Sequence, residues 1–155
     1  MLGLLTRVAF VALLAGGAVG QAKYSLRVSP IGIRTELLLF GDRNHKTFLG
    51  CLNCGQYDSA SVCNRYGNHG SRFSSESIWN RFREYGSRFA SYSPWNKYAT
   101  NPPVIVDREG NFYGYFTSNR FHSKRTNSKF HLTFLDNVDE VNDDLERARD
   151  LFCAD

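Results

Sequence analysis

Four cysteines carry the clearest chemical potential in this sequence of 155 residues: Cys51, Cys54, Cys63 and Cys153. An even number of cysteines is typical of a disulfide framework in small proteins of oxidising compartments, and four cysteines allow three pairings. The short span between Cys54 and Cys63 favours a bond between these two. Cys51 would then pair with Cys153 and tie the C-terminal end of the chain to its N-terminal half.

The spacing of Cys51-Leu52-Asn53-Cys54 is also that of a redox motif. A reactive pair of this kind has its first thiol at a helix N-terminus, where the thiol pKa falls. Here the motif follows an apolar run and precedes a stretch rich in Ser and Gly, which favours a structural role. A zinc site needs ligands in converging pairs, and Cys63 and Cys153 have no neighbouring cysteine. We therefore predict neither a metal nor another cofactor.

Residues that could act as catalytic acids or bases are scattered through the chain. Asp107, His122 and His131 are the candidates for an alternative function as a secreted hydrolase. Asp107, Glu109 and Asn111 begin like a calcium loop, but the glycine falls two places early and the closing Glu is missing. The sequence contains no Gly-x-Ser-x-Gly, phosphate-binding glycine loop or His-Glu-x-x-His motif. A non-catalytic role is therefore favoured, and the enzyme assignment stays open.

A sixteen-residue repeat occupies residues 57–102, with its copies at 57–66, 73–82 and 89–98. The shared pattern is aromatic, any residue, Ser, any residue, Ser, apolar, Trp or Cys, Asn, basic, aromatic. Units this short bury little surface alone and gain stability by stacking on their neighbours. We expect two ladders of side chains, one formed by Tyr57, Phe73 and Phe89 and the other by Cys63, Trp79 and Trp95. The serine two places before each Trp or Cys is expected to cap a single turn; these are Ser61, Ser77 and Ser93.

Basic side chains also recur in register across the copies and could form a binding surface. The candidate binding residues are Arg65, Arg81, Lys97, Arg72, Arg88, Trp79 and Trp95. Aromatic rings beside amides can bind sugar faces, while rings beside arginines can bind single-stranded nucleic acid or acidic polymers. A binding row is expected to lie on the side away from the acidic C-terminal helix. In the alternative interpretation the aromatic rings form the core, the Asn side chains satisfy turns and the arginines are simply solvated.

Two hairpins are expected to frame the repeats. Residues 37–40 and 47–49 are apolar runs on either side of a Gly/Asp/Asn turn, and residues 104–107 and 112–117 flank a second turn. Phe130 to Phe134 alternates apolar and polar residues like a half-buried strand. The sequence therefore predicts an α+β fold, with antiparallel β-hairpins, the three-copy repeat as an insertion and one C-terminal amphipathic helix.

The predicted C-terminal helix has its apolar residues at helical spacing between Val138 and Phe152. From Asp136 onward the chain has eight acidic residues against two arginines, whereas residues 21–135 are basic. We expect the acidic segment to pack beside the basic body and to neutralise part of its charge. Alternatively, the basic body presents a charged face to an anionic partner.

Residues 1–20 have the pattern of a secretory signal peptide. Arg7 precedes an apolar run, and small residues at Ala18 and Gly20 suit a peptidase that cuts near residues 20–22. The run is shorter than the roughly 20 residues that cross a bilayer, so a retained N-terminal anchor is the less favoured alternative. We expect residues 21–155 to form a single exported domain, periplasmic or secreted, without a membrane span.

The repeats resemble those of an uncharacterised family of small exported bacterial proteins. The resemblance rests on Gly50-Cys51-Leu52-Asn53-Cys54, on the Ser-x-Ser-x-x-Trp-Asn repeats and on Pro-Pro-Val-Ile-Val-Asp at residues 102–107. It covers about half of the chain and implies no activity. The sequence thus predicts an exported, disulfide-stabilised structural or binding module, with an anionic or glycan polymer of the cell envelope as its partner.

The export hypothesis predicts where the mature chain begins. Exported protein should start at Gln21 or Lys23, because these residues follow the two small-residue cleavage patterns. Intact-mass analysis of the exported material measures this directly. Retention of Met1 in that material would contradict the signal-peptide assignment.

Overall fold

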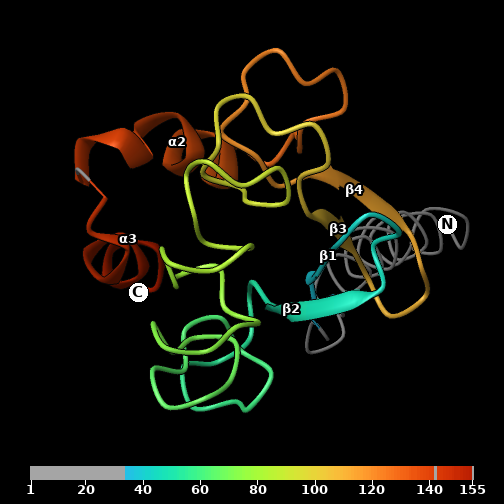
Figure 1. Cartoon of the computed structure of the whole chain (residues 1–155). Coiled ribbons are helices and arrows are strands. Elements are labelled where there is room, and N and C mark those ends of the chain that lie inside the picture. The colour runs from blue at the N-terminus through green and yellow to red at the C-terminus, as the bar shows by residue number, and fades with distance from the viewer. Residues whose placement is uncertain (1–33, 142, 155) are drawn as a thin grey trace, which may run out of the picture. The chain divides into compact units, whose positions relative to one another are not determined.

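The computed structural model describes residues 34–141 and 143–154, and Thr35–Asp155 form one compact unit. The proposed signal peptide, residues 1–20, lies outside the described residues. Within the compact unit, the chain first forms two strands, then a long stretch of turns and two further strands. Short helices follow (Figure 1).

The sheet is antiparallel and has the strand order β2-β1-β3-β4. Its strands are β1 Leu38–Gly41, β2 Thr47–Cys51, β3 Val104–Val106 and β4 Phe112–Tyr115. Both expected hairpins are confirmed, because β1 pairs with β2 and β3 pairs with β4. The two hairpins join where Leu39 lies opposite Ile105, and both side chains are fully buried. Apolar and β-branched residues on the inner face therefore fix the centre of the sheet.

Residues 55–99, which we call the turn coil, contain no helix and no regular strand. Instead, backbone hydrogen bonds close one turn after another along the chain. In the second copy the N–H groups of Ser74, Ser77, Asn80 and Arg83 each donate to the carbonyl three residues earlier, and Ser87 donates to the carbonyl four residues earlier. Four steps of three residues and one step of four make up the sixteen-residue period.

The serines and asparagines of the repeat lie at the corners of these turns. Ser77 Oγ accepts a hydrogen bond from Trp79 N at 3.1 Å, and Ser61 and Ser93 act in the same way in the other copies. Asn80 uses both ends of its amide, since Oδ1 accepts from Phe82 N and Nδ2 donates to Ser74 O. The expected capping role of the serines is confirmed. Side chains here satisfy backbone groups that a helix or sheet would otherwise pair.

Two glycines allow the chain to cross closely over itself between the copies. A Cβ atom added to Gly70 would lie 2.1 Å from Asn64 O, and one added to Gly86 would lie 2.2 Å from Asn80 O. Real Cβ atoms do not approach an oxygen this closely, so no other residue fits without moving the backbone.

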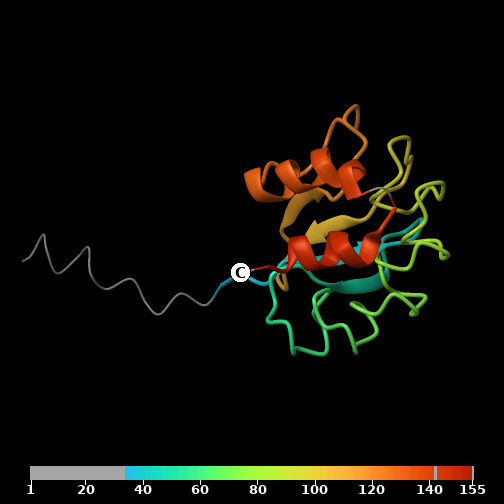
Figure 2. The same cartoon turned by 90° about the vertical axis from the view of Figure 1, so that its left-hand side faces the viewer.

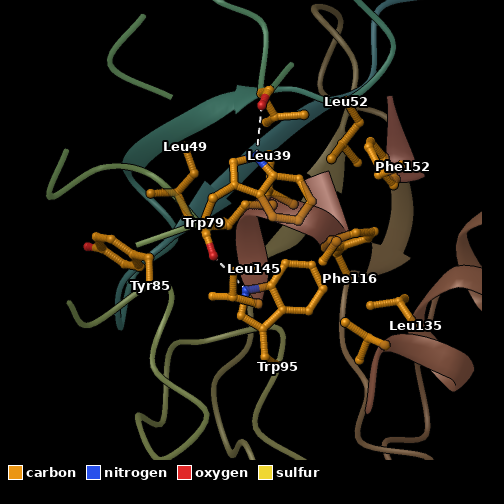
Figure 3. Close-up of a cluster of buried hydrophobic side chains, with 14 of the residues drawn as sticks. Leu39, Leu49, Leu52, Trp79, Tyr85, Trp95, Phe116, Leu135, Leu145 and Phe152 are labelled. Atoms are coloured by element: carbon orange, nitrogen blue, oxygen red, sulfur yellow. Dashed lines mark hydrogen bonds between the residues drawn. The ribbon is translucent and has the colours of Figure 1, made fainter. Parts of the chain in front are cut away.

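The interior of the turn coil is filled by two tryptophans. Trp79 and Trp95 stack with their ring centroids 5.2 Å apart, and the indole N–H groups donate to Val62 O at 2.7 Å and Ile78 O at 2.5 Å (Figure 3). Each tryptophan therefore bonds to the copy before its own. The expected Trp ladder is confirmed for these two rings, which pack against the core residues Leu39, Leu49, Ile105, Phe116, Leu135 and Phe152.

The C-terminal part differs from the sequence prediction. Residues 130–134, expected as a strand, belong to helix α2 Lys129–Asn137, which Ser128 caps. The expected single helix is divided into a 3-10 turn, η1 Val138–Val141, and helix α3 Leu145–Phe152. The sequence was ambiguous because Phe130 and Phe134 are also four residues apart, which places both on one helix face against Phe152. Asp143 has a φ of 67°, which no α-helix tolerates, and Asp144 then caps α3.

The disulfides join Cys51 to Cys54 and Cys63 to Cys153, so the expected pairing was wrong. Cys63 stands at the repeat position that Trp79 and Trp95 occupy in the other copies, and its side chain packs against the same core. Cys153 comes directly after α3 and packs against that core as well. The chain turns directly after β2, which brings the Cα atoms of Cys51 and Cys54 within 5.5 Å. Cys63 thus provides a covalent link to Cys153 where the other two copies have a buried ring.

Helix α3 is also held to the turn coil by a buried arginine. Arg149 is only 2% exposed, and its guanidinium donates to Gly70 O at 3.0 Å. Its charge is balanced by Asp150 at 3.2 Å and Glu146 at 3.5 Å. Removing one partner of a buried charge is costly, so this contact fixes α3 against the joint between the first two copies.

The tryptophan contacts predict a graded loss of stability. Trp79→Phe keeps a ring but leaves the buried Val62 carbonyl without its donor, which should cost about 1–3 kcal/mol of unfolding free energy. Trp79→Ala should cost about 3–5 kcal/mol, because it also leaves a cavity. Urea unfolding of the oxidised protein measures both, and Phe89→Ala, an exposed ring of the next copy, should stay within about 0.5 kcal/mol of the parent. Equal stability of Trp79→Phe and the parent would show that the indole hydrogen bond does not hold the copies together.

Candidate functional site

The remaining aromatic side chains of the repeats point into solvent. We call them the outer rings, and their exposed fractions are 87% for Tyr57, 95% for Tyr66, 77% for Phe73, 79% for Phe82, 86% for Phe89 and 80% for Tyr98. Among the described residues no ring-to-ring contact joins Tyr57, Phe73 and Phe89, so the ladder expected for them is wrong. Apolar side chains that are exposed together mark interaction sites, whereas singly exposed ones need no explanation, so what matters is which of these rings gather.

The outer rings and the buried tryptophans follow the same kind of corner. Phe82 lies two residues after Asn80, whose Oδ1 accepts its N–H, and Phe73 and Phe89 follow Ser71 and Ser87 in the same way. Trp79 follows Ser77 likewise and yet points inward, so the position within the repeat decides which side chains face outward. Because a single Trp or Cys per copy fills the interior, the coil has no space for the outer rings.

Three of the outer rings line an open groove. One part of it, with a volume of about 740 Å³, lies between the second copy and the start of α3, and an adjoining part of about 410 Å³ lies toward the third copy. Phe82 lines both parts. We call the whole the aromatic groove, and its principal lining residues are Phe73, Phe82, Phe89, Arg72, Arg81, Arg88, Asp143, Asp144 and Glu146.

Two of these rings have a neighbouring guanidinium over them. The Cζ atoms of Arg72 and Arg81 lie 4.7 Å from the centroids of Phe73 and Phe82. Each exposed contact of this kind contributes about 0.5–1 kcal/mol and restricts the orientation of the ring. The groove thus combines partly fixed apolar rings with both guanidinium and carboxylate groups.

Most of the predicted basic rows pair with the acidic C-terminal segment, residues 136–150. Arg65 contacts Asp150 at 2.7 Å, and Lys97 contacts Asp139 at 2.6 Å. Arg72 pairs with Glu146 at 2.7 Å, and Arg88 pairs with Asp143 at 2.9 Å. The expectation that the row faces away from the acidic helix is therefore wrong, and the expectation that this segment neutralises the basic body is confirmed. Arg81 has no ion pair within the described residues.

Two other groups of predicted residues are used inside the fold. Trp79 and Trp95 are 1% and 4% exposed, so they support the surface without contacting a ligand. The asparagine amides, expected beside the rings as sugar ligands, are bonded within their own turns. The polar groups available beside the outer rings are instead the arginines and the carboxylates at the start of α3.

The three hydrolase candidates do not converge. Asp107 accepts hydrogen bonds from Asn111 and Tyr113 within its own hairpin, which lowers its pKa. The His122 ring packs at a tilt of 48° against Tyr115, and burial lowers the pKa of His122. His131 lies between Phe116 and Phe152, and burial lowers its pKa to about 4. Within the described residues no hydrogen bond joins any two of the three.

Two negative findings apply to the part of the chain that the structure describes. It contains no cluster of three or more His, Cys, Asp or Glu side chains placed to hold a metal ion. It contains no helix with the length and apolar character needed to cross a membrane.

Sequence reasoning missed the outer rings and the carboxylates of the groove as site residues. No local signal separates the outer rings from the buried tryptophans, because Phe73 and Trp79 both lie two residues after a Ser corner. Asp143 and Glu146 could have been recognised by charge complementarity, because the basic residues of the repeats require partners and only the C-terminal segment is rich in acids.

His131 makes stability depend on pH. Its pKa falls from 6.5 in the unfolded chain to about 4 in the fold, so between these values the unfolded state binds more protons. The unfolding free energy should be fully present above about pH 6.5 and decrease as the pH falls toward 4. His131→Phe should remove most of this dependence in urea unfolding at several pH values, leaving smaller contributions from His69 and His122, whose pKa values burial also lowers. An unchanged pH profile in the variant would contradict this assignment.

No protein-family model, no curated protein and no solved structure matches this chain. The resemblance of its repeats to those of small exported bacterial proteins therefore stays a prediction, and the function is inferred from the geometry of the aromatic groove.

Proposed function

We propose that this chain is an exported, disulfide-stabilised binding module that holds a polysaccharide of the cell envelope in the aromatic groove. The observation that carries the proposal is the set of exposed rings Phe73, Phe82 and Phe89 along one groove, beside guanidinium and carboxylate groups. A binding role is favoured over a catalytic one, because the acid–base candidates are separate and engaged in the fold.

The groove offers the chemistry that a sugar polymer requires. The C–H faces of sugar rings are apolar and can lie flat on an aromatic ring such as Phe82. Sugar hydroxyls both donate and accept hydrogen bonds, so they can donate to the carboxylate of Asp144 and accept from the guanidinium of Arg81. A β-1,4-linked chain is extended, and the faces of its sugar rings lie along its sides. Such a chain can therefore contact successive aromatic side chains along a groove.

A glycan fits better than the anionic polymer that the basic rows suggested. Arg72 and Arg88 are already paired with Glu146 and Asp143, so little of their positive charge remains for a ligand. The same carboxylates line the groove and would repel phosphate or carboxylate groups on a polymer. Two observations support an anionic polymer as the alternative partner. The chain has a net charge of +4, and Arg81 makes no ion pair within the described residues.

Export is part of the proposal and has two supports. All four cysteines are paired in disulfides, and such bonds persist mainly in oxidising compartments. The pattern of residues 1–20 is that of a secretory signal. A periplasmic or secreted location would bring the groove to the polysaccharides of the envelope.

The proposal predicts that the three groove rings carry the binding. Titration calorimetry of the oxidised protein with a soluble β-1,4-linked polysaccharide should give measurable affinity. Removing each ring should cost about 1–3 kcal/mol, by analogy with stacking on aromatic side chains, so Phe73→Ala/Phe82→Ala/Phe89→Ala should bind at least about 100-fold more weakly. The variant should remain folded, because exposed rings contribute little to stability.

Phe112→Ala is the matched control, since this half-exposed ring lies on β4 and does not line the groove. A salt series separates the two polymer classes, because binding to a polyanion such as heparin weakens steeply with salt and binding to a neutral glycan does not. The proposal fails if the triple variant binds the polysaccharide as tightly as the parent. Tight, salt-sensitive binding to heparin alone would instead establish the anionic alternative.

A further inference from the structure

We infer that residues 117–126 form a fourth unit of the turn coil and extend the polysaccharide-binding surface beyond the three sequence copies. The added ring is Phe121, which stands at the same repeat position as Tyr66, Phe82 and Tyr98. The inference rests on the proposed function, because it assigns a further binding residue to the same surface. Four independent observations support it.

The first observation is local. Asn119-Arg120-Phe121 repeats the Asn, basic, aromatic sequence that ends each copy. Asn119 Oδ1 accepts from Phe121 N at 3.0 Å, as Asn80 Oδ1 accepts from Phe82 N at 3.1 Å. The turn at Asn119 closes with His122 N donating to its carbonyl at 3.1 Å, and the next turn closes from Arg125 to His122. The segment thus has the same corner chemistry as the copies.

The second observation is how this segment contacts the third copy. The carbonyls of Val62 and Ile78 each accept the indole N–H of the following copy. Pro94 holds the equivalent position in the third copy, and its carbonyl accepts Ser118 N at 2.7 Å. Ser118 directly precedes Asn119, as Trp79 precedes Asn80, so a backbone N–H takes the place of the missing indole. Nδ2 of Asn119 also donates to Ala99 O at 3.2 Å.

The third observation is the order of the ion pairs along the acidic segment. The basic residue of the first copy, Arg65, pairs with Asp150, and that of the third copy, Lys97, pairs with Asp139. Arg120 continues the series by contacting Asp136, with its Nε at 3.4 Å from Oδ1. Arg81 of the second copy makes no such pair within the described residues. The three units that do make one meet the acidic segment at successively earlier residues, which places residues 117–126 next after the third copy.

The fourth observation is the exposure of the ring. Phe121 is 92% exposed, similar to the outer rings and unlike an apolar residue with a packing role. Both overall views show the green first copy at the bottom, the yellow end of the coil above it and the orange loop of residues 117–126 at the top (Figures 1 and 2). A polymer that leaves the aromatic groove and continues past the third copy would therefore reach Phe121 next.

The test compares the parent with Phe121→Ala on β-1,4-linked N-acetylglucosamine oligosaccharides of increasing length, by titration calorimetry. The affinity of the parent should continue to rise for chains longer than those that fill the aromatic groove. Phe121→Ala should bind the short chains like the parent and the longest chain about 5–100-fold more weakly, which corresponds to one lost ring. Phe112→Ala serves as the control, and urea unfolding confirms that all the proteins are equally folded.

The outcomes separate the two proposals. If the parent binds long chains and Phe121→Ala binds them equally well, Phe121 is not part of the surface, while the proposed function stands. If Phe121→Ala weakens short and long chains to the same extent, the placement of Phe121 beyond the groove is wrong. If the parent binds no oligosaccharide of any length, this inference fails together with the proposed function.

Discussion

The turn coil depends on hydrogen bonds from backbone N–H groups to the side chains at its corners. A chain that folds back every three residues cannot pair its backbone groups in a ladder, yet buried groups must be paired. Ser and Asn at three-residue spacing solve this, since Ser77 and Asn80 each accept an N–H two residues on. The spacing of corners sets the period, and the period aligns the tryptophans. The interior stack and the outer rings both follow from this one constraint.

The acidic segment acts as a brace along the turn coil. Within the described residues, the bonds that join the first copy to the second and the second to the third are made by side chains, such as the indole N–H groups and the ion pairs with residues 139–150. Exposed ion pairs contribute little individually. The buried Arg149 and the Cys63–Cys153 bond attach helix α3 firmly to the first copy and the joint that follows it. The basic rows are therefore mainly structural, and they leave the outer rings as the distinctive feature of the surface.

The sheet could be predicted from the sequence because its apolar runs and turn residues act locally. The turn coil could not, since a spacing of three residues belongs neither to the helix nor to the strand. The pattern of residues 130–134 is compatible with the period of a strand and with that of a helix. Packing of Phe130 and Phe134 against Phe152 selects the helix. Loop length favoured Cys54 as the partner of Cys63, but the register position of Cys63 decided otherwise. One of the two interpretations of the repeats placed the outer rings in the core, because aromatic residues are usually buried. One Trp per copy leaves them no room there.

The bond between Cys63 and Cys153 has a consequence for how the protein is made. Cys153 lies 90 residues after Cys63 in the sequence. During synthesis, Cys63 therefore emerges long before its partner. The first copy has neither its covalent link nor the buried contact of Arg149 until helix α3 has been made. The coil is thus completed late, by contacts far apart in sequence, which form slowly. Export as proposed would benefit from this, because a chain that folds late can still pass through a translocation pore.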